Sequence, residues 1–313
     1  MLGKPSDWVA ERKWDGIRGQ VIIRSSKLYV WSRGEELLTG KFPEFAGFVH
    51  TLPDGCVLDG EIMAYRNGNP LSFNLLQTRI GRKVVSKKIL SEAPVSFMAY
   101  DILEKEGKDI RSLPFRNRRE LLSNLISVHN HPNLILSPEV SFSSWEKLAE
   151  ERDKSREYFC EGIMLKKSNS SYGVGRKRGD WWKWKIDPFS IDAILIYAMR
   201  GHGRRSNLYT DYTFAVWDGK DLVPFTKAYS GLTDEEFRQV DAFVKRNTIE
   251  RFGPVRSVKP ELVFEIHFEG IARSKRHKSG VALRFPRMHR WRKDKPAKEA
   301  NTVKDLMNLI DIQ

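Results

Sequence analysis

The sequence predicts two domains, an α+β domain in residues 1–187 and an all-β barrel with one helix in residues 188–313. Three observations predict this arrangement. With 313 residues, the chain is long enough for two ordinary domains with separate cores. Strand-like and helical patterns mix irregularly before Asp187-Pro188, which favours an α+β domain over a doubly wound sheet. Strand-like patterns dominate after that dipeptide.

The first domain begins with a predicted hairpin, because a short polar segment separates β-rich runs at residues 21–23 and 28–31. Leucines at helical spacing follow Pro114, a residue that suits the first turn of a helix. Ser143 and Glu146 form a capping-box pattern, which predicts the start of the next helix. Further strands are expected at residues 56–65, 95–103 and 161–166.

The second domain contains strand-like runs and one helical pattern. A capping box at Thr233 and Glu236 opens the helix, and a turn at residues 218–220 joins the second and third runs. Five strands and one helix are the inventory of an OB barrel, which frequently binds nucleic acid. The expected strands are residues 191–198, 212–217, 222–229, 262–268 and 281–285.

The charge of the chain points to a polyanionic partner. The 54 Lys and Arg residues exceed the 40 Asp and Glu residues, which gives a net charge of +14 and a pI near 9.7. Such a field attracts polyanions, chiefly nucleic acid inside a cell. The alternative is a basic protein without such a partner. The interleaved aromatic and basic residues of WWKWK (residues 181–185) count against that alternative.

The sequence contains neither an apolar run of about 20 residues nor a secretory signal. Cys56 and Cys160 lie in apolar stretches, and we expect reduced core residues rather than a disulfide. The chain is therefore expected to be a cytoplasmic monomer without membrane contact.

The segment ERKWDGIR (residues 11–18) contains Lys13, the first candidate for chemistry. A lysine is a nucleophile only while its amine is neutral. Desolvation, the neighbouring Arg12 and Arg18, or a bound metal would favour that form. The alternative is an ordinary solvated lysine.

Paired side chains further along the chain suggest a site for a metal and phosphates. Glu61 and Glu161 each lie in a strand-like run, where two carboxylates could hold a divalent cation beside phosphates. Lys183 and Lys185 share one face of a strand, which suits a triphosphate. Ordinary strand acids and an amphipathic edge strand are the alternatives.

These pieces occur in a recognisable order. KWDGIR (residues 13–18) resembles the K-x-D-G-x-R nucleotidyl-attachment motif of bacterial-type ATP-dependent DNA ligases, and RFPRMHRWRKDK (residues 284–295) is similar to their closing motif. The resemblance spans nearly the whole chain. It implies an α+β nucleotidyltransferase (adenylation) domain of ATP-grasp-like type, residues 1–187, followed by an all-β OB-fold barrel with one helix, residues 188–313. The motifs between are SRGE (32–35), DGE (59–61), YDIL (100–103), EGIMLK (161–166) and KWK (183–185).

The resemblance also implies residue roles. Lys13 would attack the α-phosphate of ATP to form a lysyl–AMP, while Glu11 reads the adenine edge and Arg18 contacts the sugar and later the nick. Asp15 would lie near the 3′-hydroxyl of the nick. Arg33 and Glu61 would hold the ribose and the active-site geometry, while Lys183 and Lys185 would contact the α-phosphate. Tyr100 would stack on adenine, in preference to Phe97, which lies on the other face of the strand. Glu161 and Glu61 would bind Mg²⁺ or Mn²⁺, and Arg292, Asp294 and Lys295 would orient pyrophosphate.

The function implied is an ATP-dependent DNA ligase of the cytoplasm, acting in the bacterial nucleoid. It would seal 3′-OH/5′-phosphate nicks in double-stranded DNA through a lysyl–AMP and an adenylated 5′-phosphate, releasing AMP and pyrophosphate. An RNA ligase or mRNA-capping nucleotidyltransferase of the same superfamily is one alternative. A non-catalytic DNA-binding module is another.

The nucleophile lies at position 13, so we expect either a minimal two-domain ligase or the catalytic core of a longer protein, with the segment MLGKPSDW favouring the latter. Without a helical DNA-binding domain, a basic surface would grip the nick, and binding would depend steeply on salt. The candidate DNA contacts are Arg82, Lys83, Lys87, Lys88, Arg176, Lys177, Arg178, Arg204, Arg205, Arg273, Lys275, Arg276 and Lys278.

Overall fold

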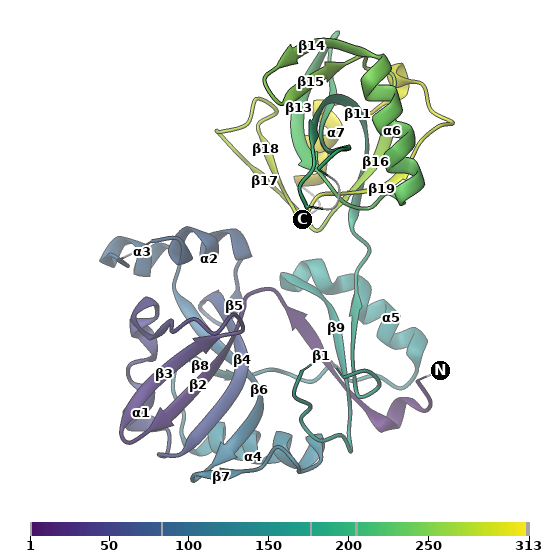
Figure 1. The fold of residues 1–313 in the computed structure, drawn as a ribbon. Helices are drawn as coiled ribbons and strands as arrows, with labels where there is room; N and C mark the ends of the chain where they lie inside the picture. Colours follow the sequence, from purple (N-terminus) through teal and green to yellow (C-terminus); the bar gives the residue numbers. More distant parts are fainter. Residues whose placement is uncertain (1, 83, 176, 204–205, 311–313) are drawn as a thin grey trace. The chain divides into compact units, whose positions relative to one another are not determined.

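The computed structural model describes residues 2–82, 84–175, 177–203 and 206–310. The chain separates into two units, Met1–Ile186 and Asp187–Gln313, each with its own hydrophobic core (Figure 1). In the described part of the chain, no helix is long and apolar enough to cross a bilayer. Cys56 and Cys160 are buried and carry free thiols.

The larger sheet of the first unit has the strand order β3-β2-β4-β6-β7, with β5 paired to β4 and β8 paired to β6. The pair β6–β8 is parallel, and the others are antiparallel. The predicted hairpin is confirmed, because Ser25 and Ser26 form a two-residue turn in which both have positive φ. The strands are β2 (Ile17–Arg24), β3 (Lys27–Ser32), β4 (Cys56–Arg66), β5 (Asn69–Pro70), β6 (Val95–Lys105), β7 (Lys108–Asp109) and β8 (Leu134–Leu136).

A smaller sheet in the same unit has the order β1-β9-β10. Residues 11–18 span the end of β1 and the start of β2, so this segment connects the smaller sheet to the larger one (Figure 1). Side chains from a single short stretch can therefore reach both sheets. The three strands are β1 (Trp8–Trp14), β9 (Cys160–Lys167) and β10 (Trp181–Lys185).

Two of the helices in the first unit were expected from sequence. Pro114 is the N-cap of α4 (Phe115–Val128) and not a residue of its first turn. The prediction that Ser143 caps the next helix is wrong. Ser144 caps α5 (Trp145–Asp153), because its extended backbone lets the hydroxyl accept the N–H of the third helical residue at 3.3 Å. The other helical segments are α1 (Phe48–Thr51), α2 (Phe73–Ile80), α3 (Lys87–Glu92) and the 3₁₀ turns Pro5–Asp7, Thr39–Lys41, Pro43–Phe45 and Lys154–Tyr158.

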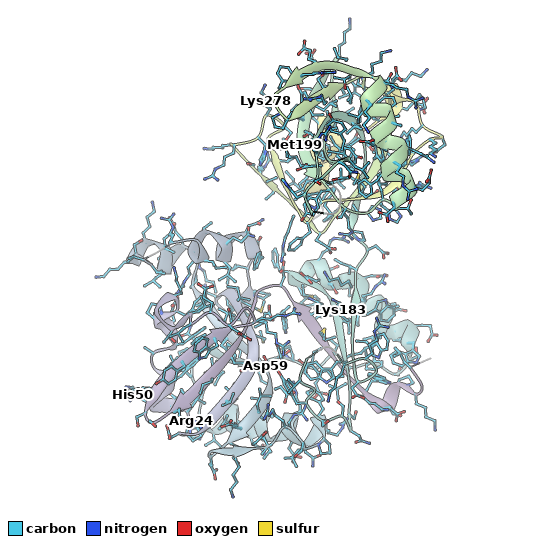
Figure 2. The ribbon with its side chains drawn as sticks, viewed as in Figure 1. Arg24, His50, Asp59, Lys183, Met199 and Lys278 are labelled. Carbon is cyan, nitrogen blue, oxygen red and sulfur yellow. The ribbon has the colours of Figure 1, made fainter. Side chains whose placement is uncertain are left out.

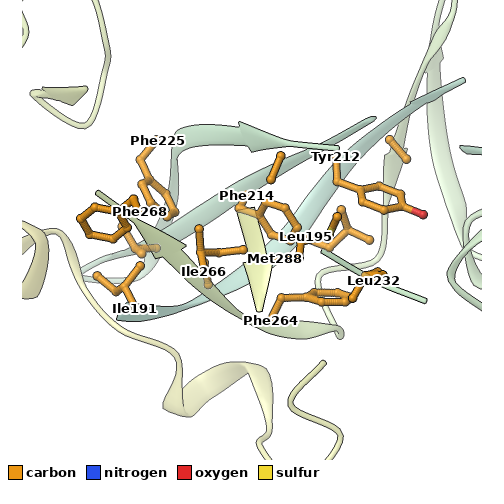
Figure 3. Close-up of a cluster of buried hydrophobic side chains, with 14 of the residues drawn as sticks. Ile191, Leu195, Tyr212, Phe214, Phe225, Leu232, Phe264, Ile266, Phe268 and Met288 are labelled. Atoms are coloured by element: carbon orange, nitrogen blue, oxygen red, sulfur yellow. The ribbon is translucent and has the colours of Figure 1, made fainter. Parts of the chain in front are cut away.

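The second unit is built on a sheet of order β13-β12-β11-β15-β14, to which β16 and β19 are added through β11. Figure 3 shows its core, in which Phe214, Phe264 and Leu195 are buried between the strands. The predicted capping box at Thr233 and Glu236 is confirmed at the start of α6. The elements are β11 (Phe189–Arg200), β12 (Tyr209–Asp218), β13 (Asp221–Ala228), α6 (Asp234–Arg246), β14 (Thr248–Phe252), β15 (Val255–Val258), β16 (Val263–Phe268), the hairpin of β17 (Gly270–Arg273) and β18 (Val281–Arg284), β19 (Arg287–Trp291), the 3₁₀ turn Ala297–Glu299 and α7 (Val303–Ile310).

The predicted inventory of five strands and one helix is too small for this unit. The helix α7 is a second one, and it packs against β12 and β17 with Leu306 buried. The strands β14, β15, β17 and β19 were also missed. Since β14 exposes four of its five residues, its sequence shows no apolar alternation. The sequence of β19 is rich in basic residues, so it also shows no apolar alternation typical of a strand.

Candidate active site

A cavity of about 380 Å³ in the first unit is lined by side chains from both sheets, a size that suits a small molecule. Figure 2 marks Asp59 on β4 and Lys183 on β10, strands that belong to the two sheets. The structure places eight of the predicted site residues around this cavity, namely Glu11, Lys13, Arg18, Arg33, Glu61, Tyr100, Lys183 and Lys185.

Lys13 forms an ion pair with Glu161 of β9, and Lys185 Nζ lies 3.2 Å from the same carboxylate. The ladder between β1 and β9 explains why. Arg12 pairs with Ile163 and Trp14 pairs with Cys160, so two residues of β9 oppose Lys13 alone. Such a bulge bends its strand and re-aims its side chains. Glu161 therefore contacts two residues that line the cavity, Lys13 and Lys185.

Gly162 is the second residue of this bulge and can only be glycine. Its φ of 140° belongs to the region that side chains avoid. A Cβ atom there would also lie 2.2 Å from the carbonyl oxygen of Trp184 on β10. In the motif EGIMLK, the glycine is therefore required by the backbone conformation, and the glutamate by the chemistry.

The two arginines expected to favour a neutral Lys13 are each held by another carboxylate. Arg12 bonds to Glu151 and lies over the ring of Tyr158, with 4.3 Å from the guanidinium carbon to the ring centroid. Arg18 bonds to Asp59 at 2.7 Å. The cation that shares a carboxylate partner with Lys13 is Lys185.

Glu11 is buried and accepts hydrogen bonds from two cations that sequence reasoning did not assign a role. Lys166 Nζ donates to its Oε1 at 3.0 Å, and Arg119 Nη1 lies at 3.5 Å. The Lys166 ammonium is itself buried among aromatic rings, with Tyr100 at 4.5 Å and Trp181 at 4.6 Å from Nζ to the ring centroid. The sequence signal that could have identified Lys166 as a site residue is its position as the last residue of the motif EGIMLK.

The two aromatic candidates on β6 lie on opposite sides of the strand. Tyr100 lines the cavity, whereas Phe97 is completely buried in the core of the larger sheet. Burial, with a further contribution from Asp59, raises the pKa of Tyr100 far above its ordinary value. Tyr100 is therefore an uncharged aromatic surface beside Lys166.

Glu61 and Glu161 differ in charge state. Burial raises the pKa of Glu61 to about 8, with Lys13 opposing the shift and Asp59 and Asp15 adding to it. Burial alone would raise the pKa of Glu161 as well, but Lys13 and Lys185 outweigh it and lower that pKa. Asp15 thus lies close enough to act on Glu61, although the cavity lining does not include it.

Arg18 belongs to a polar cluster with Asp59 and Tyr172. Tyr172 donates its hydroxyl proton to Asp59 Oδ2 at 2.7 Å and accepts from Arg18 Nη2 at 2.8 Å. Burial alone would lower the pKa of Arg18, but the hydrogen bond to Asp59 outweighs it and raises that pKa. Sequence reasoning missed Tyr172, which lies in the loop between β9 and β10.

In the second unit, the predicted residues Arg292 and Lys295 meet at Asp192 of β11, and Asp294 binds Arg292. Arg292 Nη1 and Lys295 Nζ each lie 2.8 Å from Asp192 Oδ2. Arg292 also binds Asp294 through two nitrogens, which lowers the pKa of Asp294 to about 2. Sequence reasoning missed Asp192, the acid that holds the two cations together.

The candidate DNA contacts are exposed wherever the structure describes them. Lys83, Arg176, Arg204 and Arg205 lie outside the described residues. The exposed candidates are Arg82, Lys87 and Lys88 near α3, Lys177 and Arg178 before β10, Arg273 at the end of β17, and Lys275, Arg276 and Lys278 between β17 and β18.

Known proteins share this sequence and fold. Residues 2–185 match the family described as "ATP dependent DNA ligase domain", and residues 205–295 match "ATP dependent DNA ligase C terminal region". A probable DNA ligase of Koribacter versatilis is 35% identical over 316 residues, which cover 94% of this chain and 55% of that protein. The chain spans about half the length of the curated relatives it matches.

Solved structures show the same fold. The mycobacterial DNA ligase D complexed with ATP and MES has a TM-score of 0.51 at 22% identity, covering 96% of this chain and 93% of that one. A Lig E DNA ligase has a TM-score of 0.65 at 19% identity, covering 92% and 94%. The fold is thus a nucleotidyltransferase domain followed by an OB domain. Because the family match to residues 2–185 covers more than half of the chain, this chain belongs to the ATP-dependent DNA ligase family.

Proposed function

We propose that this chain is an ATP-dependent DNA ligase that seals nicks through a lysyl–AMP on Lys13. One observation carries the proposal: the bulge opposite Lys13 brings its amine to Glu161 and Lys185, at a cavity also lined by Glu11 and Lys183. A nucleophile, phosphate-binding cations and a buried hydrogen-bond acceptor for a base therefore converge. Phosphoryl transfer requires chiefly positioning and charge neutralisation, which such a site supplies.

In the first step, the neutral amine of Lys13 attacks the α-phosphorus of ATP. The N–P bond forms, the α–β anhydride bond breaks, and pyrophosphate leaves. Lys183 and Lys185 would neutralise charge on the α-phosphate. The contact with Glu161 aims the amine, and the proton that the amine must lose before the attack passes to solvent.

In the later steps, an oxygen of the nick's 5′-phosphate attacks the AMP phosphorus and releases Lys13. The 3′-hydroxyl then attacks the 5′-phosphorus, and AMP leaves. Arg18, held by Asp59 and Tyr172, would contact the nick, and Asp15 would orient the hydroxyl. Arg292, Asp294 and Lys295 would orient pyrophosphate in the first step.

A divalent cation fits the donor set of Glu161 and Glu61. Carboxylate oxygens are preferred ligands of Mg²⁺ and Mn²⁺. Burial, with contributions from Asp59 and Asp15, raises the pKa of Glu61 to about 8, so a nearby positive charge would stabilise its ionised form. The bound ion would neutralise phosphate charge. Asp59 is less available as a ligand, because Arg18 and Tyr172 already donate hydrogen bonds to its oxygens.

The partner would be nicked double-stranded DNA, bound by the exposed basic residues around α3, before β10 and between β17 and β18. A monomer acting in the bacterial nucleoid is consistent with a net charge of +14.

Mass spectrometry after incubation with ATP and Mg²⁺ tests the proposal. We expect one AMP per chain, on Lys13, and sealing of a nicked duplex. Lys13→Ala should lose both, while Lys27→Ala, at the exposed first residue of β3, should keep both. An adduct formed only with GTP, or sealing that persists in Lys13→Ala, would contradict the proposal.

A further inference from the structure

The second unit carries a separate group of ligating side chains on β16 and β19. Atoms of Glu265, His267 and His289 that can bind a metal all lie within 4.8 Å of one another. His267 Nε2 lies 3.0 Å from Glu265 Oε1, and the two imidazole rings stack with centroids 3.8 Å apart. We propose that these three residues bind one transition-metal ion, with Zn²⁺ as the physiological class.

The backbone explains how the three residues meet. Glu265 and His267 are two positions apart on β16, so their side chains share one face of the strand. In the ladder to β19, Glu265 pairs with Arg290 but Ile266 pairs with Met288. His289 is the extra residue of this bulge, which turns its side chain toward the face of Glu265 and His267.

The donor set selects the metal. Two imidazoles and one carboxylate are a ligand set of zinc sites that keep a fourth position for water. Imidazole nitrogens favour Zn²⁺, Ni²⁺ and Cu²⁺ over Mg²⁺, which prefers oxygen ligands. The ions taken by this group therefore differ from the one that suits Glu61 and Glu161.

The carboxylate of Glu265 is oriented by two neighbours that can act as an outer shell. Ser190 donates a hydrogen bond to Oε1 at 2.9 Å, and Arg290 Nη2 lies 3.0 Å from Oε2. These two contacts hold Glu265 in place, as a ligating carboxylate needs to be.

Such a site would cross-link β16, which carries Glu265 and His267, to β19, which carries His289. It would add to the backbone ladder and the Arg290–Glu265 ion pair that already join these strands. An ion bound to the folded state alone stabilises it. We therefore expect Zn²⁺ to raise the melting temperature of the chain in addition to binding it.

Zinc binding to the full chain, first stripped of metal, tests the inference. Competition with a chromophoric zinc chelator should yield one bound Zn²⁺ per chain at micromolar concentration. His267→Ala and His289→Ala should each weaken binding by about 100-fold or more, and Ser190→Ala by about 10-fold, since loss of an outer-shell partner costs roughly 10- to 100-fold. Co²⁺ should produce the visible absorption of a low-coordinate nitrogen and oxygen site in the wild type and lose it in both histidine variants.

Two controls make the result specific. His50→Ala removes an exposed histidine of the first unit, marked in Figure 2, and should bind Zn²⁺ like the wild type. Glu161→Gln should also retain zinc binding, because it alters only the carboxylate beside Lys13. Equal zinc affinity in the wild type and both histidine variants would overturn the inference. So would loss of the bound zinc in Glu161→Gln, or absence of binding at micromolar Zn²⁺.

Discussion

Lys166 Nζ donates a hydrogen bond to Glu11 Oε1 across 3.0 Å, and both side chains are buried. The pair joins β9 to β1 in the lining of the cavity, with the Lys166 ammonium 4.5 Å from the centroid of the Tyr100 ring. A buried carboxylate needs such partners, because an unpaired charge inside a protein is costly. The pair therefore serves stability and presents the Glu11 oxygens to the cavity in one orientation.

Replacing the ammonium of this pair should destabilise the first unit. We expect Lys166→Met to lower the free energy of unfolding by about 3 kcal/mol, because it leaves Glu11 buried with less positive charge. Urea unfolding followed by fluorescence measures this loss. In the double variant Glu11→Gln/Lys166→Met, the loss should be smaller than the sum of the two single losses. Strict additivity would show that the two residues do not interact.

Gly162→Ala should disrupt the bulge that aims Glu161 at Lys13. The new methyl group would collide with the Trp184 carbonyl, and alanine avoids a φ of 140°. We expect the rate of lysyl–AMP formation to fall by about 100-fold, as expected for a nucleophile misplaced by about 1 Å. Single-turnover adenylation with labelled ATP measures the rate. Gly81→Ala is the matched control, since its methyl group would meet open space.

Tyr172→Phe should weaken the hold on Arg18 without removing its ion pair to Asp59. The lost hydroxyl accepts from Arg18 and donates to Asp59, and a hydrogen bond of this kind contributes about 1 kcal/mol. We expect nick sealing to slow by about 5- to 10-fold on pre-adenylated enzyme. The exposed Tyr229→Phe should seal at the normal rate. Equal rates for both variants would exclude a positioning role for Tyr172.

The raised pKa of Glu61 predicts a dependence of stability on pH in the metal-free protein. The folded state binds the proton of Glu61 more tightly than the unfolded chain does, whose pKa is near 4.5. The stabilisation is therefore complete below about pH 4.5 and is lost as the pH rises through about 8. Glu61→Gln should lose less stability than the wild type between about pH 4.5 and about pH 8, the unfolded and folded pKa values of Glu61. Urea unfolding at both pH values compares the two proteins, and parallel losses would contradict the assignment.

The basic loop between β17 and β18 should contribute to the salt dependence of nick binding. Each phosphate contact contributes about −0.9 to the slope of log affinity against log salt. Arg276→Ala/Lys278→Ala should therefore make the slope about 2 units shallower, provided that both side chains contact phosphates. Lys298→Ala, a 3₁₀-turn variant, is the control for the loss of one charge. Fluorescence anisotropy over a salt series measures both slopes.

The sequence by itself determined the motifs, the two-domain order and the strands that carry the site. Lys13, Glu61, Tyr100 and Glu161 could be assigned as candidates because they belong to motifs that occur in a recognisable order. Strand alternation added the choice of Tyr100 over Phe97. Tyr100 and Phe97 illustrate this, since three positions along one strand separate a cavity residue from a core residue.

Only the tertiary structure decided which side chains become partners. Lys166, Arg119, Tyr172 and Asp192 are remote in sequence from the groups they hold, so local pattern could not pair them. Two bulges, opposite Lys13 and at His289, re-aim side chains in a way that strict alternation does not foresee. The charge states were also decided by the tertiary structure. The pKa of Glu61 depends on burial and on residues of neighbouring strands, and these come together only once the sheets have formed.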